Sequence, residues 1–288
     1  FLKSQNLIEV NALGMFITAD GEEILGQLKE FIHEIKGLSK IEKSIEKHLK
    51  LKQVIIVPGD VEIDKSVLKE LGKAAANYAM DIIEDNSIIA LTGGTTVKEV
   101  VDSFPKNNKY KNILVLPARG GMARNVEIQA NTLVARLADR ISGNYELLHV
   151  PDNLSNAALE TILNEKDIKN VIDKITSADI LLYGIGIAKE MAMKRGIPQN
   201  KISELEEMGA VGEAFGQYYN ELGEIVYSTP TIMVEDEDVK HDKVLIAVAA
   251  GKNKARAIIA TEINRSSTVL IIDEAAAQKI INILEKRE

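Results

Sequence analysis

Beyond Lys52 the chain alternates short apolar runs, rich in β-branched residues, with longer amphipathic segments, and the connections between them are short. Continuous apolar strands are buried on both faces, which is typical of a parallel sheet that helices cover on both sides. The alternation therefore predicts an α/β fold built on a mainly parallel sheet. Strands are predicted at residues 54–57, 88–91, 113–116, 146–150, 180–183, 244–249 and 268–272, and helices at residues 65–83, 97–103, 127–141, 156–163, 169–177, 252–261 and 275–285.

The N-terminal residues predict a separate element ahead of this alternation. Residues 1–10 indicate a helix end running into a short strand, residues 11–14 a turn and residues 15–17 a second strand, with a helix cap from Thr18 onward. This order is that of the wing in a winged helix-turn-helix, so residues 1–20 are interpreted as the remnant of a DNA-binding domain. A hairpin that packs on the main domain fits the segment equally well. Because the chain starts without an initiator methionine, we expect it to be part of a longer protein.

Residues 21–50 predict a long helix with a narrow apolar seam. Glu42 interrupts the seam and Gly37 weakens it. Such a helix suits a linker or a dimer contact, and packing of one face on its own domain is an equally good alternative. The seam residues recur at alternating steps of three and four, and they are Ile24, Leu28, Phe31, Ile35, Leu38, Ile45 and Leu49.

Residues 217–234 depart from the alternation, because short β-like pieces around Gly223 and Pro230 predict a small antiparallel excursion. The acidic run from Glu235 to Asp238 follows, and we interpret it as a solvated loop rather than a metal site. No metal-ligand set is predicted elsewhere in the chain.

The loop after the predicted strand at 88–91 is the first candidate for a ligand site, since ligands of open α/β sheets collect outside the carboxyl ends of the strands. Gly93 and Gly94 form a tight turn, and Thr95 and Thr96 stand where the next helix begins. Backbone N–H groups, two hydroxyls and the positive end of the helix dipole would meet there, which is an arrangement that binds anions, most often phosphate.

Three further glycine turns are predicted at the same edge of the sheet. Arg119 and Gly120 follow the strand at 113–116, and a guanidinium can grip phosphate through two parallel hydrogen bonds. Gly184 and Gly186 form a bare backbone turn after the next central strand. Gly251 opens a turn that carries two lysines. Each turn alone fits an ordinary strand-to-helix connection, but their joint occurrence favours an anion site.

Bulk properties narrow the function further. A net charge of −8 argues against nucleic-acid binding by the chain as a whole, and the absence of cysteine excludes disulfides and thiolate chemistry. No apolar run approaches the roughly 18 residues of a membrane helix, so we expect a soluble protein without membrane partners. A cytoplasmic location fits this composition without being proved by it.

Candidates for catalysis are few. The glycine turns match neither the dinucleotide fingerprint nor the nucleotide P-loop, and serine-nucleophile, paired-histidine and kinase motifs are absent. Among the four histidines only His149 is predicted near the site edge, and nothing in the sequence orients it. Glu213 could act as a base or accept hydrogen bonds from sugar hydroxyls, and the second role needs no tuning of its pKa.

Several motifs together resemble the sugar-binding part of the SorC/DeoR-type bacterial transcription regulators. The resemblance spans nearly the whole chain in family order, and the N-terminal hairpin falls where the winged helix of the family ends. It implies a Rossmann-like α/β fold related to sugar-phosphate isomerases and deaminases, in which residues 51–288 form the effector-binding domain. The motifs are Thr92-Gly-Gly-Thr-Thr96, Pro117-Ala-Arg-Gly-Gly121, Gln129-Ala-Asn-Thr132, Gly184-Ile-Gly186, Glu213-Ala-Phe-Gly216 and Gly251-x-x-Lys254-Ala255.

The resemblance also implies an effector and its ligands. For members that control glycolytic genes the implied effector is fructose 1,6-bisphosphate, with no further cofactor. One phosphate would lie on the turn of Gly93 and Gly94 with Thr95, Thr96 and Lys254. The other would lie on Arg119, Gln129 and the basic pair Lys194–Arg195, with Glu213 on the sugar hydroxyls between. The implied site thus contains Gly93, Gly94, Thr95, Thr96, Arg119, Gly120, Gln129, Gly186, Lys194, Glu213, Gly251 and Lys254.

The sequence departs from the family pattern at three positions. Lys194 stands where an arginine is usual, Ile187 replaces an acidic residue, and Ala250 replaces a glycine. The first change exchanges a bidentate fork for a point charge.

Two functions therefore remain open. The first is the sensor domain of a transcriptional repressor, in which a sugar phosphate shifts the conformation or oligomer, a homodimer or tetramer, and with it the affinity of the missing winged helix for operator DNA. The second is an active sugar-phosphate isomerase or deaminase, which needs a positioned acid–base pair that the sequence does not reveal. We favour the first, a protein that is not an enzyme.

Overall fold

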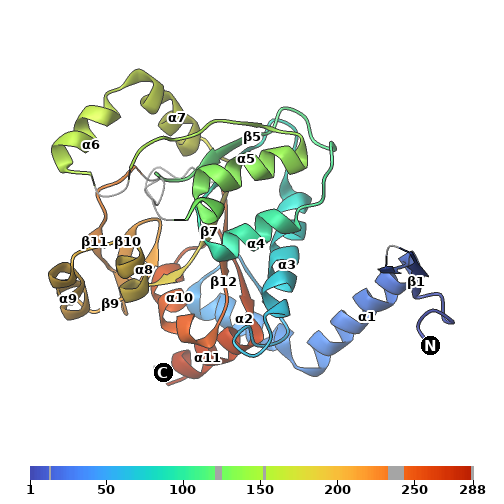
Figure 1. Cartoon of the computed structure of the whole chain (residues 1–288). Coiled ribbons are helices and arrows are strands. Elements are labelled where there is room, and N and C mark those ends of the chain that lie inside the picture. Colours follow the sequence, from blue (N-terminus) through green and yellow to red (C-terminus); the bar gives the residue numbers. More distant parts are fainter. Residues whose placement is uncertain (13, 121–124, 152–153, 233–242, 287–288) are drawn as a thin grey trace. The chain divides into compact units, whose positions relative to one another are not determined.

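A computed structural model describes residues 1–12, 14–120, 125–151, 154–232 and 243–286 of the chain (Figure 1). Contacts between residues divide it into two compact units, Phe1–Ile41 and Glu42–Glu288. The acidic run from Glu235 to Asp238 and also His241 lie outside the described residues.

The first unit consists of a hairpin and a helix. Strands β1 (Ile8–Asn11) and β2 (Gly14–Ile17) pair antiparallel, and α1 (Ala19–Ile35) follows directly. The hydroxyl of Thr18 accepts a hydrogen bond from the backbone N–H of Gly21 at 3.1 Å, as expected of a helix cap. The predicted hairpin and the predicted helix start are confirmed.

The prediction of one continuous helix through residue 49 was wrong. Helix α1 ends at Ile35 with Lys36 as its C-cap, and α2 (Leu38–Leu49) begins after Gly37, whose φ is +64°. A glycine in this left-handed conformation commonly ends a helix, because it lets the last N–H groups turn back onto carbonyl oxygens of the final turn. Here the N–H groups of Lys36 and Gly37 donate to the carbonyl oxygens of Ile32 and Glu34.

Helix α2 caps an edge of the main sheet, and this explains the charge within its apolar seam. Glu42 Oε1 accepts a hydrogen bond from the backbone N–H of Ile56 at 2.8 Å, and Glu46 Oε1 accepts one from Val54 at 2.9 Å. Both donors belong to β3 (Gln53–Val57), the outermost strand. Unpaired edge N–H groups are costly when buried, so two carboxylates one helical turn apart replace a missing neighbouring strand.

The main sheet has seven strands in the order β3-β13-β12-β7-β4-β5-β6, and all of its pairings are parallel. The fold class predicted from the sequence is confirmed. Besides β3, the strands are β4 (Ile88–Leu91), β5 (Leu114–Pro117), β6 (Asn144–Tyr145), β7 (Ile180–Gly184), β12 (Val244–Ala249) and β13 (Thr268–Asp273).

Helices cover both faces of this sheet (Figure 1). Alternate strand residues such as Leu91, Val115 and Val248 join one core with α3, α4 and α5, and the residues between them point to the opposite face, where α11 packs on β3 and β13. No described helix has the length and apolar character needed to cross a membrane. The helices are α3 (Ser66–Ile82), α4 (Thr95–Ser103), α5 (Ala130–Ile141), α6 (Asn156–Leu163), α7 (Lys166–Thr176), α8 (Ala188–Lys194), α9 (Gln199–Glu207), α10 (Ala255–Glu262) and α11 (Glu274–Leu284), with 3-10 turns at Val126–Ile128 and Lys252–Lys254 ahead of α5 and α10.

The strand predicted at residues 146–150 was wrong. The sheet ends at the two-residue strand β6, and the backbone of Leu148 pairs instead with a side chain. The amide of Asn131 donates to the Leu148 carbonyl at 3.1 Å and accepts from the Leu148 N–H at 3.2 Å. Leu148 and Val150 are buried, which gives the segment the apolar pattern of a strand although Leu148 does not pair with one.

The predicted antiparallel excursion is confirmed as a second, four-stranded sheet of order β11-β10-β9-β8. It combines β8 (Gly186–Ile187), β9 (Ala210–Ala214), β10 (Gln217–Asn220) and β11 (Ile225–Ser228). Because β8 follows β7 almost directly, this small sheet begins at the carboxyl edge of the large one.

Candidate functional site

A cavity of about 200 Å³ opens at the carboxyl edge of the main sheet. Its walls come from the loops after β4, β5, β7 and β12, four neighbouring strands. From β4 the chain proceeds outward to β5 and β6, whereas from β7 it proceeds to β12 and β13 in the other direction. The cavity therefore lies at the point where the strand order reverses, which is where ligands bind in open α/β sheets.

The loop after β4 forms one wall. Gly94 precedes α4 with a φ of +127°, a value that favours glycine, and its N–H donates to the carbonyl of Ile128 at 2.9 Å. A Cβ on Gly93 would lie 2.5 Å from the same Ile128 oxygen. Both glycines are thus needed to bring the first turn of α4, with Thr95 and Thr96, against the cavity. The N–H groups of this turn have no partners within the helix, and the helix dipole adds positive potential.

The structure brings the predicted site residues together at this cavity with one exception. Gly251 lies outside the lining residues. Its φ is +100°, and its N–H donates to Asp273 Oδ1 at 2.9 Å. A glycine is therefore required here by the conformation of the turn and not by contact with the cavity. The predicted residues that line the cavity are Gly93, Gly94, Thr95, Thr96, Arg119, Gly120, Gln129, Gly186, Lys194, Glu213 and Lys254.

The cavity is also lined by side chains outside that list, among them Glu190, Met191, Phe215 and Arg195, the last of which the resemblance implied only as half of a basic pair with Lys194. Arg195 is the most informative of these. The sequence shows Lys194–Arg195 as a basic pair, but Lys194 has a 63% exposed side chain whereas that of Arg195 is 3% exposed. Arg195 follows the last residue of α8, and there its side chain turns inward. The sequence alone cannot show which of two adjacent basic residues is buried.

The carboxylate of Glu213 is held by two arginines and a backbone N–H group. Its Oε1 accepts a hydrogen bond from Arg195 Nη2 at 2.6 Å and lies 3.9 Å from Arg119 Nη1. The backbone N–H of Gly216 donates to the same oxygen at 2.5 Å. Hydrogen bonds of this kind, in which a charged donor meets a carboxylate, are shorter and stronger than those between neutral groups.

A buried tyrosine borders this group of charges. Burial raises the pKa of Tyr218 to about 12, although the positive charges of Arg195 and Arg119 act in the opposite direction. Tyr218 therefore remains a neutral phenol near pH 7, and the negative charge beside the two arginines is that of Glu213.

Lys254 reaches the cavity from the loop after β12. Its Nζ donates to the carbonyl oxygen of Ile185 at 2.8 Å. Burial lowers the pKa of Lys254, and the nearby positive charge of Lys194 lowers it further, while Glu190, Asp273 and Glu213 act in the opposite direction. Burial and a nearby like charge both disfavour the protonated amine, and a bound anion would stabilise it.

The histidine predicted near the site edge does not line the cavity. His149 is exposed and is not among the lining residues. Within the described ranges, no three His, Asp or Glu side chains gather in a way that could hold a metal ion. The polar lining residues are instead hydroxyl side chains, cations and Gln129, with Glu190 and Glu213 as the carboxylates, and glycines and apolar side chains such as Ile185, Met191 and Phe215 complete the walls.

Fold and cavity together define an α/β domain with a glycine- and cation-lined cavity at the switch point of its sheet. The chain belongs to the sugar-binding family of SorC/DeoR-type transcription regulators, since the family model described as "Putative sugar-binding domain" matches residues 33–282. The resemblance seen in the motifs is thereby confirmed.

Particular relatives share almost the whole chain. The "Central glycolytic genes regulator" of Bacillus subtilis is 39% identical over 281 residues, 98% of this chain and 83% of the relative. The protein of the same name from Priestia megaterium is 38% identical over 98% of this chain and 82% of its own length. A solved structure, "The crystal structure of the putative SorC family transcriptional regulator from Enterococcus faecalis", is 34% identical with a TM-score of 0.77, covering 84% of this chain and 99% of that one.

Proposed function

We propose that this chain senses fructose 1,6-bisphosphate as the effector-binding part of a regulator of glycolytic genes. The observation that carries the proposal is the cavity at the switch point, where a helix N-terminus with two threonines and four cationic side chains meet. The name shared by the relatives from Bacillus subtilis and Priestia megaterium supports the glycolytic assignment. A bisphosphate suits a site whose anion-binding groups come from several separate loops.

One phosphate is assigned to the start of α4. There the backbone of Gly93 and Gly94, the hydroxyls of Thr95 and Thr96 and the amine of Lys254 would surround its oxygens. The other phosphate is assigned to Arg119, Arg195, Lys194 and Gln129, and the sugar lies between the two groups. All of these side chains line the one cavity.

The alternative function is a sugar-phosphate isomerase or deaminase. Such an enzyme needs a free general base beside the sugar. The buried carboxylate of the cavity, Glu213, already accepts hydrogen bonds from Arg195 and Gly216, and this favours a structural role over proton transfer. The named relatives are regulators as well.

The coupling to DNA is proposed to run through the first unit. Residues 1–20 would be the last part of a winged helix that binds operator DNA, and a second copy of the chain would complete the regulator. In α1 the apolar side chains of Ile24, Leu28, Phe31 and Ile35 are exposed and recur at steps of four, three and four residues. This spacing is that of a helix-pairing seam, which supports a homodimer contact there.

The proposal is tested by thermal unfolding with two ligands and by a turnover assay. Fructose 1,6-bisphosphate is expected to raise the melting temperature more than fructose 6-phosphate does, because a ligand that binds only the native state stabilises it by an amount that grows with the logarithm of its affinity. No turnover of fructose 6-phosphate or glucosamine 6-phosphate is expected. Equal or absent shifts would reassign the effector, and a rate that Glu213→Ala abolishes would show an enzyme.

Lys254 makes the affinity for the bisphosphate depend on pH. Anion binding favours the protonated amine, so affinity is complete below the lowered pKa of Lys254 and is lost as the pH rises through it. The loss of affinity should begin below the pH range in which an ordinary lysine titrates, because the pKa of Lys254 is lowered. The ligand phosphates are already ionised above about pH 7, so they add little pH dependence in that range. Calorimetric titrations between neutral pH and pH 10 measure this. Lys254→Arg, which keeps its charge, should flatten the profile, and an unchanged profile would remove Lys254 from the site.

A further inference from the structure

From the sequence, Glu213 is interpreted as an acceptor for sugar hydroxyls, but the contacts of one of its oxygens, Oε1, indicate a second task. Its Oε1 takes the N–H of Gly216 at 2.5 Å and Arg195 Nη2 at 2.6 Å. A carboxylate oxygen offers about two lone-pair positions, and both are in use. Arg119 Nη1 lies 3.9 Å from the same oxygen, within reach of its charge.

The surrounding backbone is shaped to hold this arrangement. Phe215 and Gly216 form the turn between β9 and β10 with φ values of +56° and +94°, and the first is unusual for a bulky residue. A Cβ on Gly216 would lie 3.4 Å from Arg195 Nη1 and 3.6 Å from Arg119 Nη1. Both guanidinium groups therefore come close to the same backbone position, which the turn places beside Glu213.

We propose that Glu213 is a positioning residue, which holds the guanidinium groups of Arg195 and Arg119 in the orientation that receives a ligand phosphate. The inference rests on the proposed function, since it concerns how that anion site is organised. Long cationic side chains lose much conformational freedom when they bind a ligand, and a partner that fixes them beforehand removes this cost. The side chains of Glu213 and Arg195 are each 3% exposed and that of Arg119 is 6% exposed, so solvent screens their interaction weakly.

Three roles for Glu213 predict three different patterns of effect on the two ligands. If the carboxylate only repels anions, its neutralisation tightens phosphate binding. If it only accepts sugar hydroxyls, neutralisation weakens sugar phosphates and spares a bisphosphate without hydroxyls. If it positions the arginines, neutralisation weakens both ligands, because the phosphate loses oriented donors whatever carries it.

The experiment compares wild type and Glu213→Gln in calorimetric titrations with fructose 1,6-bisphosphate and hexane-1,6-diol bisphosphate. We expect Glu213→Gln to weaken both ligands by roughly tenfold to a hundredfold, as expected when two cationic side chains are no longer fixed. Glu190→Gln serves as the matched control. Glu190 also lines the cavity, yet its side chain is 56% exposed and its Oε2 lies 3.9 Å from Nζ of the exposed Lys194. Its neutralisation should tighten both ligands slightly.

The outcomes separate this inference from the function beneath it. The positioning role would be overturned if Glu213→Gln bound the hydroxyl-free bisphosphate as tightly as wild type does, or more tightly. The sensor proposal would still stand in that case, provided that wild type binds fructose 1,6-bisphosphate. A wild type that binds neither ligand would overturn both. Thermal unfolding of each variant in the absence of ligand checks the fold, and Glu213→Asp, which keeps the charge on a shorter stem, should recover part of the affinity if Glu213→Gln proves unstable.

Discussion

Replacing Arg119 by alanine is expected to weaken the binding of fructose 1,6-bisphosphate by roughly a hundredfold, which corresponds to about 3 kcal/mol. The guanidinium of Arg119 is nearly fully buried at the cavity, where weak screening strengthens its interaction with a phosphate. Truncation removes these donors and also releases Glu213 from one of its two cations. The loss is measured by calorimetry, with circular dichroism to verify the fold.

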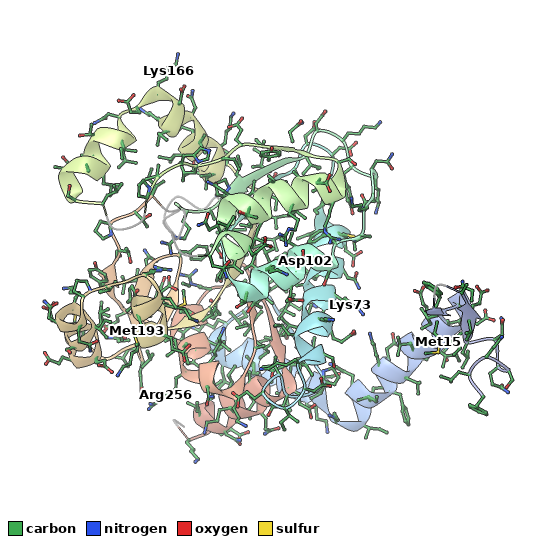
Figure 2. The ribbon with its side chains drawn as sticks, viewed as in Figure 1. Met15, Lys73, Asp102, Lys166, Met193 and Arg256 are labelled. Carbon is green, nitrogen blue, oxygen red and sulfur yellow. The ribbon has the colours of Figure 1, made fainter. Side chains whose placement is uncertain are left out.

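Arg136→Ala is the matched control for this change. Arg136 sits on α5 in ion pairs with Asp102 at 3.1 Å and Glu127 at 2.8 Å, outside the cavity lining. Asp102, on α4, is labelled in Figure 2. The control loses an arginine and its ion pairs, so it reports what such a loss does to the fold alone. If Arg119→Ala binds the bisphosphate as tightly as Arg136→Ala does, Arg119 has no place in the site.

Gly93→Ala is expected to reduce affinity for the bisphosphate by at least about a hundredfold and to lower stability by roughly 1–3 kcal/mol. The added Cβ would come within 2.5 Å of the Ile128 carbonyl oxygen and 3.1 Å of the Ala130 N, and both are backbone atoms that cannot rotate away. The loop after β4 must then move, and with it the first turn of α4, which carries the proposed phosphate contacts. Calorimetry and thermal unfolding measure the two effects.

Gly26→Ala provides the comparison for Gly93→Ala. A Cβ on Gly26 meets no atom within 4 Å, and the residue lies within α1, where alanine favours the helix by about 1 kcal/mol over glycine. This variant should bind as wild type does and be no less stable. Bisphosphate binding that survives Gly93→Ala undiminished would show that the start of α4 does not hold a phosphate.

The fold could be predicted from the sequence wherever apolar runs report burial on both faces. The six long strands of the main sheet follow from that pattern, whereas the antiparallel excursion, seen as β10 and β11, follows from short β-like pieces around Gly223 and Pro230 that depart from it. The pattern failed at residues 146–150, because Leu148 is as buried as a strand residue while a side chain, that of Asn131, satisfies its backbone. It also missed the break at Gly37, since the apolar seam continues in register across a left-handed residue.

The site could be predicted as a set of loops but not as a set of contacts. The glycine turns after neighbouring strands mark the cavity edge, because parallel strands align their carboxyl ends. Which way a side chain turns within a loop depends on packing, so Arg195 and Lys194 were indistinguishable in the sequence. For the same reason Gly251, which resembles the other turn glycines, was assigned to a cavity that it does not line.

The central claim is that two separate groups of residues hold the two phosphates of one ligand in this cavity. The most direct test is a calorimetric titration of the wild-type chain with fructose 1,6-bisphosphate, fructose 1-phosphate and fructose 6-phosphate under one set of conditions. The account predicts one bisphosphate bound per chain, with an affinity at least about a hundredfold above that of either monophosphate, since a second set of charge-assisted hydrogen bonds contributes about 3 kcal/mol. A monophosphate that binds as tightly as the bisphosphate, or a bisphosphate that does not bind, would contradict it.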